Sequence, residues 1–191
     1  MVDVHVRPAR PEDAEAVARI QLATWRIAYA QVIPESVLAA LDEDAVAAQW
    51  RSAVVEPPTP RHRLLVAYEG AVTVGFAAIG PAAPEDVVGP GHESAAPSTD
   101  QWDTRTLLVS ALLVEPRWGR RGHGSRLLAA VADVAREDGF TRAVAWALEA
   151  DAATRTFLES AGWAPDGVGR VLDMNGSEVP ELRLTTAFID D

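Results

Sequence analysis

The fold of this chain is most constrained by residues 106–135, where three patterns follow one another directly. The run Thr106–Val114 is almost entirely apolar and too short to cross a membrane, which predicts a strand covered on both faces. Residues 115–126 come next and hold four arginines and three glycines. Apolar residues then recur at helical spacing, at Leu127, Leu128, Val131, Val134 and Ala135. We therefore expect a buried strand, a glycine-rich turn and a helix in direct succession.

A glycine-rich turn at the start of a helix is a place where an anion can bind. The first helical turn leaves backbone N–H groups unpaired and concentrates roughly half a positive charge there. Gly122 and Gly124 have no side chain to hold a ligand away from those N–H groups. Four arginines against Glu115 give residues 115–126 a net charge of +3. We expect a phosphate-containing ligand here, and the alternative is an arginine-rich surface turn that serves solubility.

Two other phosphate-binding motifs fit this turn poorly. The nucleoside triphosphate loop needs a Gly-Lys-Ser or Gly-Lys-Thr step, and this chain contains no lysine. The dinucleotide fingerprint, Gly-x-Gly-x-x-Gly, follows an early strand, whereas this turn lies past the middle of the chain. Its third glycine would fall at Leu127.

The turn resembles the GNAT-type N-acyltransferases, in which a strand ends in Val-x-Pro and Gln/Arg-x-x-Gly-x-Gly/Ala opens a helix. Val114-Glu115-Pro116 and Gly122-His123-Gly124 match this pattern, whereas Gly119 stands where Gln or Arg is usual. The resemblance implies that the turn holds the pyrophosphate of coenzyme A, and that the end of the strand splays from its neighbour to accept the pantetheine. It assigns these residues to the coenzyme: Leu112, Leu113, Val114, Gly119, Arg120, Arg121, Gly122, His123, Gly124, Ser125, Asp151 and Leu158. Arg120 or Arg121 would compensate for Gly119.

The resemblance continues beyond the turn. Arg142–Glu149 reads as the next strand, and Ala152–Ala161 reads as a helix that ends at Gly162. Gly162-Trp163 is similar to the family's Gly-Phe step.

The usual general acid of the family has no counterpart in this helix. The family commonly has Asn and then Phe-Tyr, with the tyrosine hydroxyl near the departing thiolate, where this chain has Asp151, Phe157 and Leu158. Leucine cannot donate a proton. A thiol with a pKa near 8.5 leaves as an anion without full protonation, so the missing acid weakens catalysis and does not abolish it.

The general base is also unassigned. Many family members use a glutamate on the strand before the turn, where this chain has residues 107–109, Leu-Leu-Val. Asp103, Glu115 and Glu149 are acids nearby in sequence, and a water chain is the alternative. We name no catalytic residue. The absence of cysteine excludes a thioester acyl-enzyme, so direct transfer in a ternary complex is expected.

The acceptor side is expected from the first helices, which border the acceptor pocket in the family. Trp25 and Tyr29 lie one helical turn apart before Ile33-Pro34, although such a pair is more often part of a core. Residues 81–103 hold four prolines, two glycines and five acids, which predicts a long mobile loop. This loop would bring Trp102 and His92 near the acceptor, and a tolerated insertion is the alternative.

Composition limits the other functions. The net charge of −11 argues against general nucleic-acid binding. No apolar stretch is long enough for a membrane helix and the amino terminus lacks a signal peptide, so we expect a cytoplasmic protein with no membrane partner. The four histidines form no close pair in the sequence and there is no cysteine, so we assign no metal. A monomer or a homodimer is expected.

The remaining elements complete an α/β (α+β) fold in one domain over residues 1–191. Strands are expected at Val2–Arg7, Leu64–Tyr68, Val72–Ile79, Arg170–Asp173 and Glu181–Phe188, and helices from Pro11 to Ala30, after Pro34, and over Glu43–Val55. The resemblance implies a mixed, mostly antiparallel central sheet of about seven strands flanked by helices.

Three functional hypotheses follow. The first is an acyltransferase that moves acetyl from acetyl-CoA to the primary amine of a small molecule or peptide, with backbone N–H groups near Leu113 and Val114 stabilising the oxyanion. The second is a non-catalytic acyl-CoA-binding module, favoured by Gly119 and Leu158. The third is an unrelated binder of nucleotide phosphates.

Overall fold

The protein is built on one twisted sheet of seven strands. The computed structural model describes residues 3–28, 30, 33–88, 105–174 and 176–188. The strand order is β1-β2-β3-β4-β5-β7-β6, and among the strands of the described residues only β4 and β5 pair in parallel. The strands are β1 (Val4–Pro8), β2 (Arg63–Glu69), β3 (Val72–Pro81), β4 (Thr106–Val114), β5 (Arg142–Leu148), β6 (Ala164–Met174) and β7 (Ser177–Ala187). The predicted mixed, mostly antiparallel sheet of about seven strands is confirmed.

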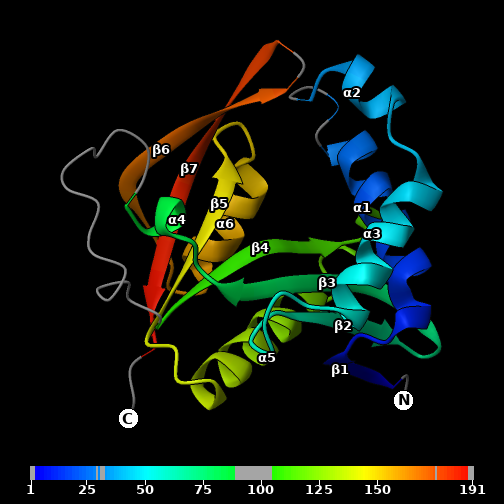
Figure 1. Cartoon of the computed structure of the whole chain (residues 1–191), viewed down its shortest axis with the longest axis horizontal. Helices are drawn as coiled ribbons and strands as arrows, with labels where there is room; N and C mark the ends of the chain where they lie inside the picture. Colours follow the sequence, from blue (N-terminus) through cyan, green and yellow to red (C-terminus); the bar gives the residue numbers. More distant parts are fainter. Residues whose placement is uncertain (1–2, 29, 31–32, 89–104, 175, 189–191) are drawn as a thin grey trace.

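Helices connect and cover these strands (Figure 1). The helices are η1 (Pro11–Asp13), α1 (Ala14–Ala28), α2 (Glu35–Ala39), α3 (Glu43–Val55), α4 (Pro84–Val88), η3 (Pro116–Trp118), α5 (His123–Glu137) and α6 (Ala152–Ser160). The predicted range of α3 matches, and α6 ends one residue before the predicted end. Among the described residues, no helix is long and apolar enough to span a membrane.

The sheet has a hydrophobic core on each face. Leu65 and Ala67 of β2 pack in the core that contains the apolar faces of α5 and α6. Leu64 and Val66, the alternate residues of the same strand, pack with Val17 and Ile20 of α1 and with α3. Figure 1 shows α1 and α3 on one side of β2–β4 and α5 on the other. The sheet therefore lies between two hydrophobic cores, and each core is covered by its own layer of helices.

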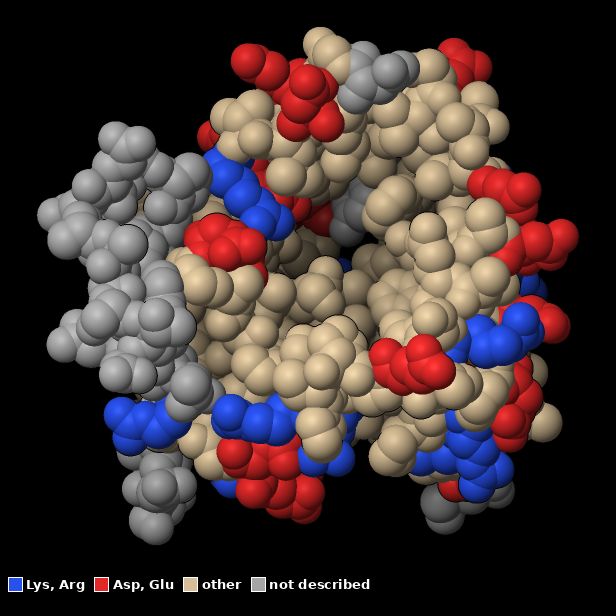
Figure 2. All heavy atoms as spheres, viewed as in Figure 1, with Lys and Arg blue, Asp and Glu red and all other residues tan. Residues whose placement is uncertain are grey.

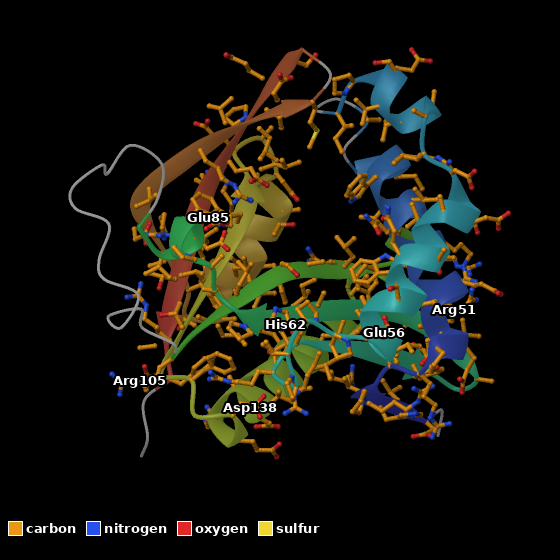
Figure 3. The ribbon with its side chains drawn as sticks, in the orientation of Figure 1. Arg51, Glu56, His62, Glu85, Arg105 and Asp138 are labelled. Carbon is orange, nitrogen blue, oxygen red and sulfur yellow. The ribbon has the colours of Figure 1, made fainter. Side chains whose placement is uncertain are left out.

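Helix α5 is held to the sheet at its carboxyl end. Asp138, labelled in Figure 3 at the end of α5, accepts hydrogen bonds from the Arg63 side chain of β2, the shortest at 2.6 Å. The Arg61 guanidinium lies 3.8 Å from the centroid of the Phe140 ring, just beyond this helix. These contacts help to fix the axis of α5, and with it the position of the turn that precedes it.

Part of the predicted loop at residues 81–103 is regular structure. Pro81 ends β3, and residues 84–88 form α4, which carries Glu85 in Figure 3. The prediction was wrong here because α4 is fixed by polar contacts rather than apolar packing. Asp86 is buried and accepts a hydrogen bond from Trp146 Nε1 at 2.9 Å, and Arg183 Nη1 donates to the Asp86 carbonyl oxygen at 2.7 Å. Residues 89–104 lie outside the described part of the chain.

Strands β6 and β7 are longer than predicted. Pro165, Gly167 and Gly169 disfavour a strand by local preference, but β6 is an edge strand with a register irregularity between Pro165 and Gly169. Pro180 of β7 pairs with Val171 of β6, and its carbonyl oxygen accepts from the Glu149 N–H at 2.9 Å, so its ring nitrogen faces the side of β7 where the pairing with β5 has ended. The resulting long β6–β7 hairpin rises above β5 in Figure 1.

The entry to α1 is fixed by a buried ionic cluster. Asp13, 4% exposed, accepts hydrogen bonds from Arg7 at 2.8 and 3.1 Å, from the Arg10 N–H at 2.7 Å, and from the Tyr68 hydroxyl. Burial raises the pKa of Asp13, but the hydrogen bonds from Arg7 and Tyr68 outweigh it, so the net pKa lies below its ordinary value. The cluster joins β1, β2 and the start of α1.

We expect Asp13→Asn to lower the free energy of unfolding by about 2–3 kcal/mol at pH 7, because Arg7 would lose its charged partner. A lowered carboxyl pKa stabilises the fold above the unfolded value of about 3.9, and this contribution disappears as the pH falls through the folded value. The difference in the free energy of unfolding between the variant and the parent should therefore disappear at acidic pH. Urea unfolding at several pH values measures this difference.

Glu12→Gln is the matched control for this prediction. Glu12 precedes Asp13 in the same turn, but its side chain is 67% exposed and its nearest ion pair, with Arg10, spans 3.9 Å. We expect a change within about 0.5 kcal/mol. Equal effects of the two substitutions at pH 7 would contradict the role given to Asp13.

Candidate functional site

Strands β4 and β5 pair only at their first halves. Their parallel pairing runs from Thr106 and Arg142 to Val109 and Ala145, and the described residues that follow on the two strands do not pair with each other. On the other side of β4, the register with β3 shifts between Ala78 and Ile79, so that Ser110 has no partner there. A bulge of this kind bends its strand, which suits the observed splay of β4 from β5.

The splay frees backbone N–H groups of β4. The Glu115 N–H donates to the Val74 carbonyl oxygen of β3 at 2.9 Å. The alternation of an antiparallel ladder then turns the N–H of Leu113 toward β3, and those of Leu112 and Val114 toward the gap beside β5. Of the two backbone donors expected near the reacting carbonyl, Val114 therefore faces the gap and Leu113 does not.

Two clefts adjoin at this gap. The turn cleft, about 790 Å³, is lined by residues 118–125 except Arg121, by the carboxyl end of β4, and by α6. The strand cleft, about 450 Å³, lies between the diverging strands and is walled by α1, α3 and β6. Leu112, Thr154 and Phe157 line both, so the two clefts meet at these residues. Figure 2 shows the face of the molecule hollowed between the strands and α1.

The turn before α5 has the geometry expected of an anion site. Gly122 is the N-cap of α5 with φ 80°, in the left-handed region, and no side chain caps the helix. Arg120 also has positive φ, at 62°. A Cβ on Gly124 would lie 3.2 Å from the Phe157 ring, so only glycine keeps the space between α5 and α6 open without displacing that ring. The first N–H groups of α5 are thus left for a ligand.

The arginines of this turn are not all free, contrary to the expectation that the four add charge around its mouth. Arg117 pairs with Glu115 at 2.7 Å, Arg121 pairs with Glu69 at 2.5 Å, and Arg126 donates to the Arg121 carbonyl oxygen. Arg120 is exposed and, among the described residues, has no ion pair or hydrogen bond. The described lining of the turn cleft includes Arg120 and no carboxylate. Arg126 has no acidic partner among the described residues, and its Nη1 lies 3.0 Å from the place that a Cβ on Gly122 would take. Two arginines, Arg120 and Arg126, rather than four, are therefore positioned to add charge.

Glu69, at the end of β2, organises the turn from a distance and was not among the residues expected from the sequence. It accepts from Arg121 at 2.5 Å and lies 2.8 Å from Nε2 of His123, which is 1% exposed. The side chains of Arg121 and His123 therefore face Glu69, and the buried His123 offers only backbone atoms to a ligand of the turn. A residue more than fifty positions away leaves no local pattern in the sequence.

The structure describes some of the residues at the positions where the family has its general acid or where an acid of this chain could act as the base. Leu158 is buried at the wall of the strand cleft, and Asp151 caps α6 by accepting from the Thr154 N–H at 3.0 Å. Neither Glu115 nor Glu149 is among the described residues that line the two clefts. Asp103, Tyr29, His92 and Trp102 lie outside the described residues, so their predicted places in the site stay predictions.

The strand cleft is lined by Trp25, one of the residues predicted for the acceptor side, and by aromatic residues that the sequence analysis did not name. Trp50 of α3 donates from Nε1 to Gln21 at 2.7 Å and packs edge-on against Phe76. Trp146 of β5 is covered by the Arg170 guanidinium, 4.1 Å from its ring centroid. Both tryptophans lie in segments whose periodicity indicates only a helix or a strand, which explains why they were missed.

The family follows from comparison with known proteins. A profile described as the acetyltransferase (GNAT) family matches residues 20–163, a span that includes β4, the turn, α5 and α6. The chain belongs to the acetyltransferase (GNAT) family. The family, the enzyme class of N-acetyltransferase and the use of acetyl-CoA, all predicted from the sequence, are thereby confirmed.

Individual GNAT proteins are similar over most of the chain. The uncharacterized N-acetyltransferase YuaI of Bacillus subtilis is 28% identical over 147 residues, 76% of this chain and 72% of YuaI. The PaiA N-acetyltransferase of Thermoplasma acidophilum, solved with coenzyme A, has a TM-score of 0.70 at 14% identity and covers 97% of this chain and 99% of its own. The structure of yncA of Salmonella typhimurium, solved with acetyl-CoA, has a TM-score of 0.66 at 18% identity and covers 98% of this chain and 95% of its own. These structures confirm the fold.

Proposed function

We propose that this protein transfers the acetyl group of acetyl-CoA directly to a primary amine, with the coenzyme in the turn cleft and the acceptor in the strand cleft. The observation that carries this proposal is the junction of the two clefts at the splay of β4 from β5. A donor bound from one side and an acceptor from the other would meet there without a covalent intermediate on the protein. The absence of cysteine agrees with such a ternary complex.

The turn fits the diphosphate of the coenzyme. The uncapped N-terminus of α5 offers backbone N–H groups of residues 123–125, and Arg120 adds a positive charge at the mouth. The gap beside β4 is open to the pantetheine arm, whose amides can pair with the unpaired edge of Leu112 and Val114. In this proposal the backbone N–H groups of the turn are the main contacts to the diphosphate, and the charge of the side chains contributes less.

The chemistry needs little from side chains. The acceptor nitrogen attacks the thioester carbon and forms the C–N bond, and the C–S bond then breaks as the sulfur leaves as a thiolate. The N–H of Val114, turned toward the gap, would stabilise the negative charge on the carbonyl oxygen. The nitrogen loses its proton to water. Of the described carboxylates that line the strand cleft, Glu181 is held in an ion pair with Arg170 and Asp151 caps α6.

Release of free thiol from acetyl-CoA in the presence of an amine panel tests this function. We expect acceptor-dependent release above the rate of hydrolysis, with initial-rate patterns that intersect as a ternary complex requires. Tight coenzyme binding with no release for any acceptor would favour a non-catalytic binding module instead. The cytoplasmic location and the monomeric or dimeric state expected from the sequence stay predictions.

A further inference from the structure

One side of helix α6 faces the strand cleft. Asp151, the N-cap of α6, lines this cleft and is not among the described residues that line the turn cleft. Leu158, two helical turns further on, also lines the strand cleft, and Thr154 between them lines both. Asp151 therefore faces the space proposed for the acceptor, whereas the family resemblance assigns it to the coenzyme.

The carboxylate of Asp151 lies beside the junction of the two clefts. Its Oδ1 accepts from the Thr154 N–H at 3.0 Å, and its Oδ2 accepts from the Thr154 hydroxyl at 2.6 Å. Because Thr154 lines both clefts, these hydrogen bonds hold the carboxylate close to the place where donor and acceptor would meet. Each carboxylate oxygen can accept a second hydrogen bond. The group is thus fixed in position and can still bind a ligand.

The negative charge of Asp151 has no cationic partner in the described part of the chain. Its two donors are neutral groups, and the first turn of α6 adds only about half a positive charge. The Nε of Arg155, one turn further along α6, has no hydrogen-bond partner among the described residues. Glu181, which also lines the strand cleft, is by contrast paired with Arg170 at 2.6 Å. A bound ammonium would supply the cation that Asp151 lacks, through a charge-assisted hydrogen bond.

We infer that Asp151 binds the positively charged nitrogen of the acceptor and places it beside the thioester. This rests on the proposed function and names the residue that recognises the acceptor. The amine arrives as an ammonium, because its pKa is about 10. It loses one proton to water and attacks the thioester carbon, which makes the nitrogen positive again, and the second proton goes to water when the C–S bond breaks. Asp151 thus meets a cation both in the bound acceptor and in the tetrahedral intermediate, so its removal should act mainly on KM for the acceptor.

Binding measured without turnover tests the inference separately from the function. Phenethylamine and 2-phenylethanol share an aromatic body that suits the walls formed by Trp25, Trp50 and Trp146, and differ in an ammonium against a neutral hydroxyl. On the protein saturated with coenzyme A, we expect calorimetry to show that the amine binds at least about tenfold more tightly than the alcohol. Asp151→Asn should abolish this preference, and it keeps the helix cap because asparagine caps as well as aspartate. Equal affinities in the parent, no binding of the amine, or a preference that survives in Asp151→Asn would overturn the inference.

Initial rates distinguish an acceptor role of Asp151 from a coenzyme role. With acetyl-CoA saturating, we expect Asp151→Asn to raise KM for phenethylamine at least about tenfold, to change kcat by less than about threefold, and to leave KM for acetyl-CoA unchanged. A rise in KM for acetyl-CoA instead would return Asp151 to the coenzyme and overturn the inference. No thiol release by the parent with phenethylamine or any other amine would overturn the proposed function and leave the binding role of Asp151 to the calorimetry.

Asp42→Asn is the matched control for both measurements. Asp42 caps α3 as Asp151 caps α6, and accepts from the N–H groups of Asp44 and Ala45 at 2.9 and 3.2 Å. It is exposed and is not among the described residues that line either cleft. We expect Asp42→Asn to change neither the preference for the amine nor its KM. Equal effects of the two substitutions would mean that the overall charge of the protein, rather than Asp151, attracts the ammonium, and would overturn the inference.

Discussion

Gly122→Ala is expected to raise the KM for acetyl-CoA by about 10- to 100-fold with a much smaller change in kcat. Gly122 has φ 80° as the N-cap of α5, a conformation that costs an alanine about 1–2 kcal/mol. Relief of this strain would turn the first N–H groups of α5 away from the diphosphate. The loss of one hydrogen bond to a charged group, about 1.5–3 kcal/mol, corresponds to that range of KM.

Gly139→Ala is the matched control for backbone strain. Gly139 follows α5, has φ 75°, and a Cβ there would meet nothing within 4 Å. Both substitutions should lower stability by a similar amount, which thermal unfolding measures, but only Gly122→Ala should change the KM for acetyl-CoA. Similar KM values in the two variants would contradict the assignment of the turn to the coenzyme.

Glu69→Ala is expected to raise the KM for acetyl-CoA by about tenfold and to lower stability by about 2 kcal/mol. Glu69 is the shared partner of Arg121 and His123, so its removal leaves a buried imidazole unpaired and releases the side chains that hold the turn. Because Glu69 lines neither cleft among the described residues, kcat should change little. Initial rates against acetyl-CoA concentration separate the two constants.

Two further variants show whether Glu69 acts by positioning the turn. Glu69→Gln keeps a hydrogen-bond acceptor and should give an intermediate KM. Asp133→Ala removes an acid that pairs with Arg136 at 3.4 Å on the exposed surface of α5, and should leave KM unchanged. A loss of stability in Glu69→Ala without a change in KM for acetyl-CoA would mean that Glu69 contributes only to stability and does not position the turn.

The sequence predicted best those elements that local patterns define. The strand, turn and helix of residues 106–135 were found because apolar runs and glycines mark each boundary. The strand was expected to be covered on both faces, but only its first half is buried, because Ser110–Val114 leave the pairing with β5 and line the clefts. No local feature of the apolar run marks the bulge at Ser110.

The parts that sequence patterns missed depend on contacts between distant residues. Glu69 meets its partners more than fifty positions later, and Asp86 of α4 meets Trp146 sixty positions later. The local sequence around each member of such a pair does not distinguish it from any other polar residue, and only the folded sheet brings the two side chains into contact. The length of β6 was missed for a related reason, since an edge strand tolerates glycines that would interrupt an inner one.

A crystal structure of the complex with coenzyme A tests the central assignment most directly. We predict that the diphosphate lies within hydrogen-bonding distance of the N–H groups of His123, Gly124 and Ser125, and that the thiol ends at the junction of the two clefts beside Phe157. A coenzyme bound elsewhere on the protein, with the turn before α5 left to solvent, would contradict this account.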